Sequence, residues 1–464
     1  MLFPTGIFAI FFAVVFLGHW SLVRWAPRWD RLFLLAANLA FYAFWSVEFC
    51  AALLFVGFWT WMIGLLAGGR RSRAWLWVGV GGALLWLGWF KYTNFFIQEV
   101  LNRAEFLGLG PIPLLDIVLP VGISFYCFQA ISYMVDAYSG EAEVERSPLN
   151  VLVYLTFFPH LAAGPIVRAA HFLPQLHTPP DRFRIPVAMA AILILGGLFK
   201  KMVIASELAT GLVDPVFRDP SAYGAADVWL ASYAYSVQIF CDFSAYSDMA
   251  IGFAALLGYH FPKNFDQPFR AVTLSEFWRR WHISLSTWLR DYLYIRALGG
   301  NRRGETRTRV NLLLTMVLGG IWHGANWTFL LWGALHGAAL AVERALGGKG
   351  EPRTGTGRLL RWLITFHIVV LAFVLFRTPD MASFGAMLAG LASPLPAELV
   401  SWRLLLLVAF GLGIHFLPPD LRERVEDWIR GLPPLVLGGA VGVVLLAILL
   451  AGPEGVAPFI YFQF

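Results

Sequence analysis

Two histidines lie in aromatic, apolar sequence that is typical of a membrane interior. His282 follows a pair of arginines, and His323 lies between Trp322 and Gly324. An ionisable side chain at membrane depth is costly and usually marks a functional site. Imidazole has an ordinary pKa near neutrality, so either histidine is suited to accept a proton from a reacting hydroxyl.

The segment around His282 is predicted to form one amphipathic helix over residues 274–293, lying at the membrane interface. Its apolar residues recur at helical spacing, at positions 274, 277, 278, 281, 285, 288, 289 and 292. His282 projects about 80° from the centre of this stripe. We therefore expect it to contact the protein interior and solvent at once, although a structural histidine bonded to a carbonyl remains the alternative.

The segment around His323 crowds an imidazole with Gly319, Gly320 and Gly324. Glycine permits close backbone approach or a local helix break, so this setting favours a reactive centre. The alternative is a buried histidine bonded to a neighbouring helix. A metal site is not indicated, because no HxxH, HxxxH or HExxH occurs. A serine hydrolase is not indicated either, because there is no GxSxG motif.

The composition indicates an integral membrane protein. Hydrophobic residues make up 58% of the 464 residues and charged residues 14%, whereas soluble domains carry about 25% charged residues. The net charge of +6 is then expected to reflect topology, and not nucleic-acid binding. Cys50, Cys127 and Cys241 lie apart, so neither a disulfide framework nor a zinc site is predicted.

Apolar stretches predict about eleven membrane spans in one domain over residues 1–464. The apolar N-terminus is expected to be the first span and not a removed signal peptide. Arginines in loop 24–31 and at 70–73 place both loops in the cytoplasm. The stretch 158–168 contains helix breakers and is a candidate re-entrant turn. The spans cover residues 2–23, 32–45, 49–67, 74–90, 115–137, 149–161, 187–204, 228–257, 359–376, 402–416 and 432–450.

The span at 228–257 is the most polar, and it carries Asp242 and Asp248. These two residues lie on different faces of a helix, because they are about 600° apart at 100° per residue. We expect one of them to face a reaction chamber and the other to pair with an arginine. A structural ion pair is an equally weighted alternative for each.

Several motifs together resemble the membrane-bound O-acyltransferase family, most closely its bacterial alginate O-acetyltransferase branch. The motifs are FWRRWHISLSTWLR at 277–290, GGNR at 299–302, GIWHG at 320–324, PVGISFYCFQAISYMVD at 120–136, FFPHLAAGPIVR at 157–168, GLFKKMVIA at 197–205, DFSAYSDMAIG at 242–252 and PFIYFQF at 458–464. The resemblance implies helices around a central funnel, with His323 as the catalytic histidine and His282 as the second signature histidine.

This resemblance also implies a multi-pass protein of the bacterial inner membrane that moves acetyl groups to a polysaccharide. No cofactor is expected to be bound permanently; acetyl-CoA or a similar thioester would be the donor substrate. A periplasmic or membrane-anchored SGNH-type acetyltransferase is the expected partner. The residues expected to bind substrate or donor are Trp322, Asn326, Trp327, Arg279 and Asp242.

The basic loop with Arg302, Arg303, Arg307 and Arg309 either attracts the phosphates of coenzyme A or is a topological charge cluster. Two other functions stay open from the residues themselves. One is D-alanyl transfer from a carrier-protein thioester. The other is a transporter with a histidine proton relay, although the inverted repeats of many transporters are not found here.

Overall fold

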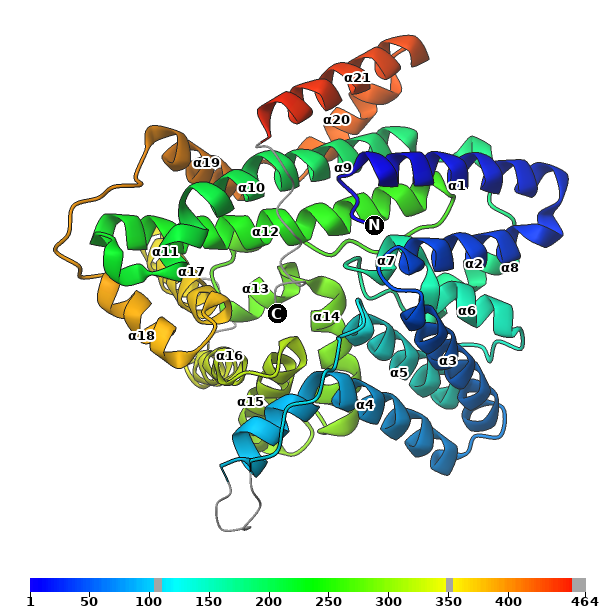
Figure 1. The fold of residues 1–464 in the computed structure, drawn as a ribbon, viewed down its shortest axis with the longest axis horizontal. Helices are drawn as coiled ribbons and strands as arrows, with labels where there is room; N and C mark the ends of the chain where they lie inside the picture. The colour runs from blue at the N-terminus through cyan, green and yellow to red at the C-terminus, as the bar shows by residue number, and fades with distance from the viewer. Residues whose placement is uncertain (104–110, 348–353, 453–464) are drawn as a thin grey trace. The chain divides into compact units, whose positions relative to one another are not determined.

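The computed structural model describes residues 1–103, 111–347 and 354–452, and the regular structure in these ranges is entirely helical (Figure 1). The predicted all-α class is therefore confirmed. The motif at 458–464 and most of the glycine-rich stretch at 347–357 lie outside the described residues. The helices group into two compact units. That the chain acts as a single domain stays a prediction.

The first unit comprises Met1–Ala190 and Met249–Pro262. Within it α3, α4 and α5 pack against one another, and α6 packs on α2 and α3. A buried ion pair between His19 Nδ1 and Asp30 Oδ1, 2.7 Å apart, joins α1 to α2. The helices are α1 Gly6–Trp25, α2 Pro27–Ala43, α3 Glu48–Ile63, α4 Arg73–Phe96, α5 Ile123–Ser139, α6 Pro148–Thr156, α7 Phe158–Leu161 and α8 Ala169–His177.

The second unit comprises Ala191–Asp248 and Lys263–Phe464 and holds both signature histidines. Two of its helices, α15 and α16, pack closely on each other as an antiparallel pair. The helices are α9 Val187–Phe199 (most of it), η5 Lys200–Ala205, α10 Ser206–Leu208, α11 Asp214–Arg218, α12 Ala225–Leu256 (most of it), α13 Leu274–Arg280, α14 Ile283–Trp288, η9 Leu289–Ala297, α15 Gly304–His323, α16 Trp327–Ala345, α17 Gly355–Arg377, α18 Met381–Gly390, α19 Trp402–Gly413, α20 Leu421–Arg430 and α21 Pro434–Ala451.

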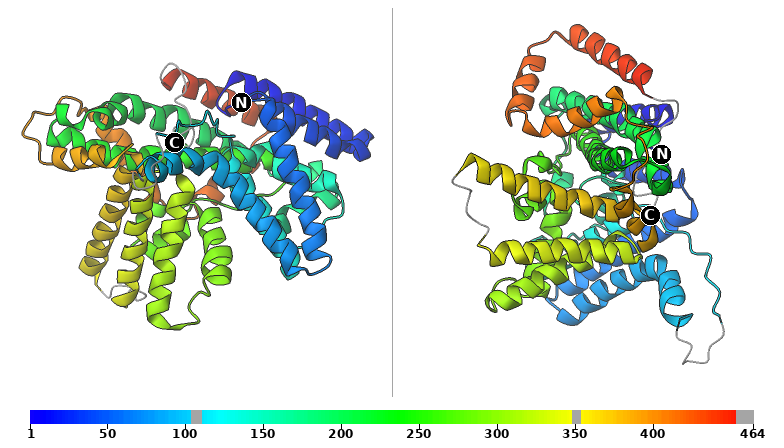
Figure 2. Two further views of the ribbon diagram at one scale, coloured as in Figure 1. Left: turned by 60° about the horizontal axis from the view of Figure 1, so that its bottom comes forward. Right: turned by 90° about the vertical axis from the view of Figure 1, so that its left-hand side faces the viewer.

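The helices α15, α16 and α17 run side by side, and Figure 2 shows the start of α15, the end of α16 and the start of α17 at one common end. Arg344 of α16 donates from Nε and Nη2 to the Glu305 carboxylate of α15, at 2.7 and 2.8 Å, and this bond closes that end. The predicted basic loop lies at the same end, where Arg302 and Arg303 precede α15 and Arg307 and Arg309 lie in its first two turns, while His323 terminates α15 at the other end.

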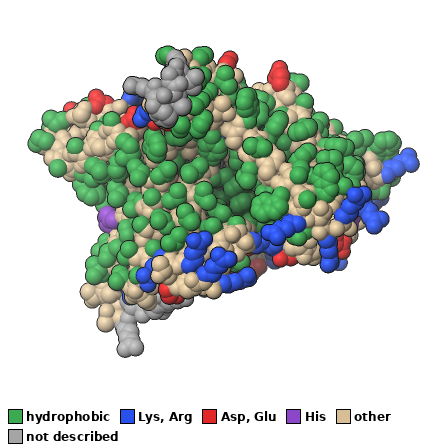
Figure 3. All heavy atoms as spheres, turned by 90° about the horizontal axis from the view of Figure 1, so that it is seen from below, with side chains coloured by type: hydrophobic (Ala, Val, Ile, Leu, Met, Phe, Trp, Pro, Cys, Tyr) green, Lys and Arg blue, Asp and Glu red, His purple; other side chains and the backbone are tan. Residues whose placement is uncertain are grey.

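Six helices of the described residues are long and apolar enough to cross a membrane, or seven if the bent pair α19–α20 counts as one span. This is fewer than the eleven predicted. Several predicted spans form shorter elements: α5 has 17 residues, and the stretch 149–161 divides into α6 and α7. A 17-residue helix rises only about 26 Å, less than the roughly 30 Å hydrocarbon core. Figure 3 shows the broad apolar surface expected of a membrane protein.

The predicted break in the stretch 158–168 is present. The four-residue helix α7 contains Pro159 and His160, and irregular backbone follows from Ala162. Most of this backbone is buried within the first unit, and the Tyr154 hydroxyl donates to the Val167 carbonyl at 2.8 Å. Irregular backbone at membrane depth is tolerated where protein satisfies its polar groups.

Candidate active site

His282 lies at a break between two helices and not within one continuous amphipathic helix. The helix α13 ends at Arg280, α14 begins at Ile283, and His282 itself has a left-handed backbone with φ of 43°. The side chain is buried, with the residue only 1% exposed. The prediction that it contacts solvent is therefore wrong. A left-handed residue resets the helical phase, so the angle calculated from the residues before it no longer applies after it.

The buried amide of Asn264 organises the surroundings of His282. Its Oδ1 accepts hydrogen bonds from the backbone N–H and the hydroxyl of Ser284, at 3.1 and 2.9 Å, and lies 3.3 Å from His282 Nδ1. Its Nδ2 donates to Ser247 Oγ of α12 at 2.9 Å. The Asn264 carbonyl accepts from Ile283 N–H at 2.8 Å. These bonds fix the left-handed turn, and burial lowers the pKa of His282, which favours the neutral imidazole.

His323 ends α15 among aromatic rings. Gly324 has extended backbone and terminates the helix directly after the histidine. The imidazole centroid lies 4.9 Å from that of Trp322, 5.0 Å from Trp332 and 5.1 Å from Phe376. His323 is 8% exposed. The apolar walls expected around this histidine are present, and Trp332 and Phe376 add to them from α16 and α17.

Close packing of α15 on α16 depends on Gly320, as its sequence setting predicts. A Cβ at Gly320 would lie 2.2 Å from the Phe329 carbonyl oxygen and 3.1 Å from the Gly333 Cα. No side chain fits that space. The glycine thus lets the end of α15 approach α16 closely, and this approach sets the position of His323 one turn later.

Trp322 brings the two histidines into one neighbourhood. Its ring centroid lies 6.5 Å from that of His282 and 4.9 Å from that of His323. Trp322, one of the predicted site residues, thus lies beside both histidines. Trp327 is 48% exposed, and Arg279 is exposed on α13. The structure therefore places Trp327 and Arg279 on the surface, while both histidines are buried.

Both the oxygen and the nitrogen of the Asn326 side-chain amide form hydrogen bonds within the protein. Its Oδ1 accepts from the Thr328 backbone N–H at 3.0 Å and caps α16, while Nδ2 donates to the Pro379 carbonyl at 2.6 Å. Asparagine is a favoured N-cap residue because its side chain satisfies an otherwise unpaired helix N–H. The predicted role of Asn326 in binding substrate or donor stays a prediction.

The two aspartates of α12 pair with adjacent lysines. Lys201 Nζ lies 2.8 Å from Asp242 Oδ1, and Lys200 Nζ lies 2.6 Å from Asp248 Oδ2. The prediction of an arginine partner is wrong, because both partners come from the π-helical turn η5. The side chains of Asp242 and Lys201 are 3% and 2% exposed. A role for Asp242 in binding substrate therefore stays a prediction beside a well-formed buried ion pair.

Comparison with known proteins assigns this arrangement to a family. The model of the membrane-bound O-acyltransferase family matches residues 141–377. Over the whole length of both chains, the sequence is 38% identical to probable alginate O-acetylase AlgI of Pseudomonas putida. The chain belongs to the membrane-bound O-acyltransferase family. It is accordingly a membrane protein and an O-acyltransferase.

Two further relatives show how the similarity varies within this membrane-bound O-acyltransferase family. A peptidoglycan O-acetyltransferase of Helicobacter pylori is 36% identical, and the match covers 84% of this chain and 79% of that protein. A teichoic acid D-alanyltransferase of Streptococcus thermophilus is 28% identical over 55% of this chain and 68% of that protein. Identity and coverage are thus greater for the O-acetyl-transferring relatives.

The sequence did not indicate Asn264, Trp332 and Phe376 as parts of this candidate site. Trp332 and Phe376 lie in ordinary apolar helices, and only the packing of three helices brings them to His323. Asn264 offered a weak signal, since it is a polar residue in the aromatic, non-helical stretch 259–267. Its importance becomes visible only when its partners on α12 and α14 are known.

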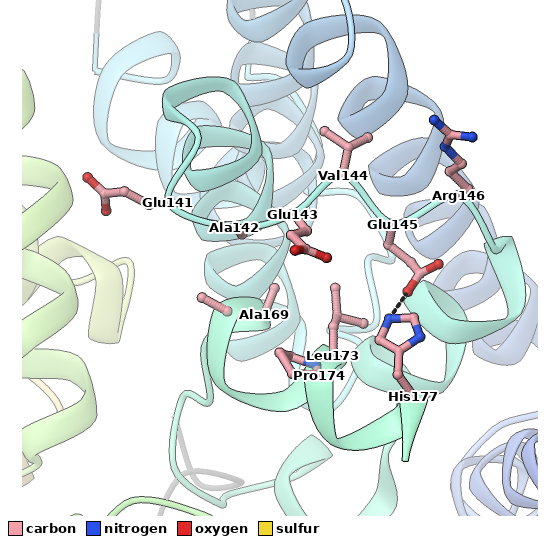
Figure 4. A pocket seen from close by; sticks show the side chains of 11 residues that line it. Glu141, Ala142, Glu143, Val144, Glu145, Arg146, Ala169, Leu173, Pro174 and His177 are labelled. Atoms are coloured by element: carbon pink, nitrogen blue, oxygen red, sulfur yellow. Dashed lines mark ion pairs between the residues drawn. The ribbon is translucent and has the colours of Figure 1, made fainter.

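A separate hollow of about 530 Å³ lies in the first unit, between the extended segment 141–146 and α8. Figure 4 shows Glu141, Glu143 and Glu145 along this segment, with Glu145 paired to His177 at 3.0 Å. Carboxylates repel a polyphosphate. With three glutamates and one arginine, Arg146, in its lining, this hollow is a poor match for a polyphosphate.

Proposed function

We propose that this O-acyltransferase is a membrane O-acetyltransferase of the bacterial inner membrane. It transfers acetyl from a cytoplasmic thioester, such as acetyl-CoA, to a hydroxyl of an exported alginate-like polysaccharide or to a periplasmic SGNH-type acetyltransferase partner. The observation that carries the proposal is His323, a buried imidazole walled by Trp322, Trp332 and Phe376 beside the second signature histidine. The names of the relatives from Pseudomonas putida and Helicobacter pylori support acetyl as the transferred group.

The chemistry needs only a positioned base. The acceptor oxygen forms a bond to the thioester carbonyl carbon, the carbon–sulfur bond breaks, and the hydroxyl proton passes to the His323 imidazole. The imidazole then returns the proton to the departing thiolate. A well-placed general base contributes about 10²–10⁴-fold to such a reaction. An aromatic, water-poor wall also limits competing hydrolysis of the thioester.

The basic end of α15 supports a donor that carries phosphates. Arg302, Arg303, Arg307 and Arg309 are all exposed there. Arg309 precedes His323 by 14 residues, which corresponds to about 21 Å along the helix. A donor held by its phosphates at this end would need an extended arm to present its thioester to His323. Coenzyme A and carrier-protein phosphopantetheine both have that general form.

The proposed orientation follows from the positive-inside rule and from the packing of the first unit. Arg31, which lies in the second turn of α2 and not in a loop, donates from its guanidinium to Asn150 Oδ1 at 3.2 Å. Gly68, before the Arg70–Arg73 cluster, lies against Val144. Both basic segments are thereby tied to the segment 144–150, which supports placing them on one side. Cysteines introduced at Ser72 and Thr306 should resist a membrane-impermeant thiol reagent in intact cells; labelling at either would reverse that assignment.

The deciding experiment uses purified protein in liposomes with radiolabelled acetyl-CoA, an alginate oligosaccharide and the periplasmic partner. Wild-type protein should transfer label. His323→Ala and His323→Gln should both fail while remaining folded and inserted, because glutamine keeps size and hydrogen bonding but cannot act as a base. His415→Gln removes another buried histidine of the second unit, which packs on Phe240 and Phe269, and should keep turnover per folded molecule.

The same assay tests the alternative of D-alanyl transfer. That alternative is favoured by the 28% identity to a teichoic acid D-alanyltransferase. Transfer from a D-alanyl carrier-protein thioester, with none from acetyl-CoA, would replace acetyl by D-alanyl in the proposal. Substantial turnover by His323→Gln would make the histidine structural and would reject the mechanism for either acyl group.

A further inference from the structure

A second hollow, of about 500 Å³, lies in the second unit and has a different chemical character. Arg270 and Arg358 line it together with the apolar side chains of Leu359, Trp362 and Phe416, and none of the described lining residues is acidic. The two arginines are 88 positions apart in sequence. The hollow thus combines two cationic groups with apolar walls, and neither signature histidine lines it.

The position of the hollow along the membrane normal follows from its walls. Phe416 ends the apolar helix formed by α19 and η10 (Ile414–Phe416), whose direction changes by 89° into α20. Leu421, Val425 and Trp428 form an exposed apolar stripe on α20, between charged residues. A short helix of this kind lies along the membrane surface. Because the candidate span α17 begins at Gly355 on the opposite wall, the hollow lies at headgroup level.

Arg270 and Arg358 both have guanidinium N–H groups that are available to bind a ligand. Arg270 donates from Nη1 to Gln267 Oε1 at 2.8 Å, which occupies one of its five N–H groups. The nearby Asp266 carboxylate already pairs with Lys263 and Arg280. Neither Arg270 nor Arg358 forms an ion pair with another described residue. Two guanidinium groups at one hollow repel each other, and a bound anion would relieve this repulsion.

The apolar wall is fixed and faces outward. The Trp362 indole N–H donates to the Phe269 carbonyl at 2.8 Å, and its ring contacts that of Phe416 at a centroid distance of 5.9 Å. Leu359 and Phe416 are 55% and 56% exposed. This apolar surface continues along α17, away from its start at Gly355, through the exposed Leu363. An acyl chain could follow it while a phosphate stayed at the arginines.

We propose that this hollow binds the headgroup of an anionic phospholipid, with Arg270 and Arg358 bracketing the phosphate and Leu359, Trp362 and Phe416 contacting the glycerol and upper acyl chain. Guanidinium recognises phosphate through paired charge-assisted hydrogen bonds. Basic pockets between membrane helices have this role in general. The hollow lies at the end of the α15–α17 bundle that carries the basic loop, so the lipid belongs to the same leaflet as that loop.

Lipid binding is measured on the full chain in phosphatidylcholine nanodiscs, by native mass spectrometry and by thermal unfolding, as phosphatidylglycerol is titrated in. Wild-type protein should retain phosphatidylglycerol and unfold at higher temperature. The double variant Arg270→Gln, Arg358→Gln should bind roughly tenfold more weakly or worse, because it loses the charge-assisted hydrogen bonds from the two guanidinium groups to the phosphate. The matched variant Arg302→Gln, Arg303→Gln removes the same charge from the basic loop and should bind as wild type does.

Arg358→Gln alone guards against misfolding, because Arg358 is an exposed side chain, and it should still weaken binding several-fold. Equal binding by the double variant and the wild type would overturn the proposal. So would equal weakening in the Arg302, Arg303 control, which would indicate general charge attraction. Stabilisation of detergent-solubilised protein by inorganic phosphate, to the same extent as by phosphatidylglycerol, would identify a free-anion site and likewise reject the lipid.

Discussion

His282 is held by polar partners on a left-handed backbone, whereas His323 ends a regular helix among aromatic rings. Asn264 and Ser284 lie beside the first, which also packs on the ring of Phe243, and Trp322, Trp332 and Phe376 surround the second. A non-glycine residue with left-handed backbone costs of order 1–3 kcal/mol and persists only where its surroundings fix it. The difference teaches that two signature histidines in one neighbourhood can have different tasks; we propose that His282 positions the site and that His323 acts as the base.

The largest effect should separate the two histidines. His323→Gln should lower acyl transfer by about 10²–10⁴-fold with little change in unfolding temperature, because its neighbours are mostly rings. His282→Ala should lower both transfer and stability, since it removes the group that the Asn264 network surrounds, while membrane insertion persists. Single-turnover acyl transfer and thermal unfolding, measured on the same preparations, give the two values. Wild-type transfer by His282→Ala would remove His282 from the site.

The next-largest effect should come from the buried ion pair between Asp242 and Lys201, which lies near His282. Asp242 precedes Phe243, whose ring lies 4.6 Å from that of His282. Lys201→Met should cost about 3–5 kcal/mol of stability, because it leaves a buried carboxylate without its partner. Adding Asp242→Leu should restore much of that loss. Chemical denaturation of the reconstituted variants measures both.

Transfer activity of that double variant decides the role of Asp242. If the ion pair is structural, the restored protein should also transfer acyl groups at close to the wild-type rate. Restored stability without activity would instead show that the Asp242 carboxylate serves the reaction, as the sequence suggested.

A smaller effect should follow from Asn264, the centre of the polar network. Asn264→Leu removes the acceptor used by Ser284 and the donor to Ser247, so it should cost about 1–3 kcal/mol for buried groups left unsatisfied. Transfer should fall with it, because the turn at His282 loses its support. Asn264→Asp keeps the acceptor and should retain more of the activity. If Asn264→Leu left the rate unchanged, the network would have no part in positioning His282.

Sequence patterns predicted the helical class and the family, because these depend on composition and on local motifs, while the catalytic roles of His282 and His323 stay predictions. They misplaced His282, since helical periodicity assumes that the phase continues through Trp281 and His282. They also missed Asn264, Trp332 and Phe376, whose roles come from contacts between distant segments. The lysine partners of Asp242 and Asp248 could not be predicted from the sequence either, because a charge in one span does not reveal which neighbouring helix carries its counterion.

The smallest expected effect tests a residue on the aromatic side. Asn326 caps α16, the helix that presents Trp332 to His323, and it was also predicted to bind substrate or donor. Asn326→Ala should cost about 1 kcal/mol through loss of the cap. Asn326→Ser keeps a capping oxygen and should nearly restore stability. If Asn326 contributes only by capping α16, the rate of acyl transfer should fall and recover together with the stability in both variants. A serine variant that is stable but has a raised KM for the thioester or the acceptor would show that the amide itself contacts a substrate.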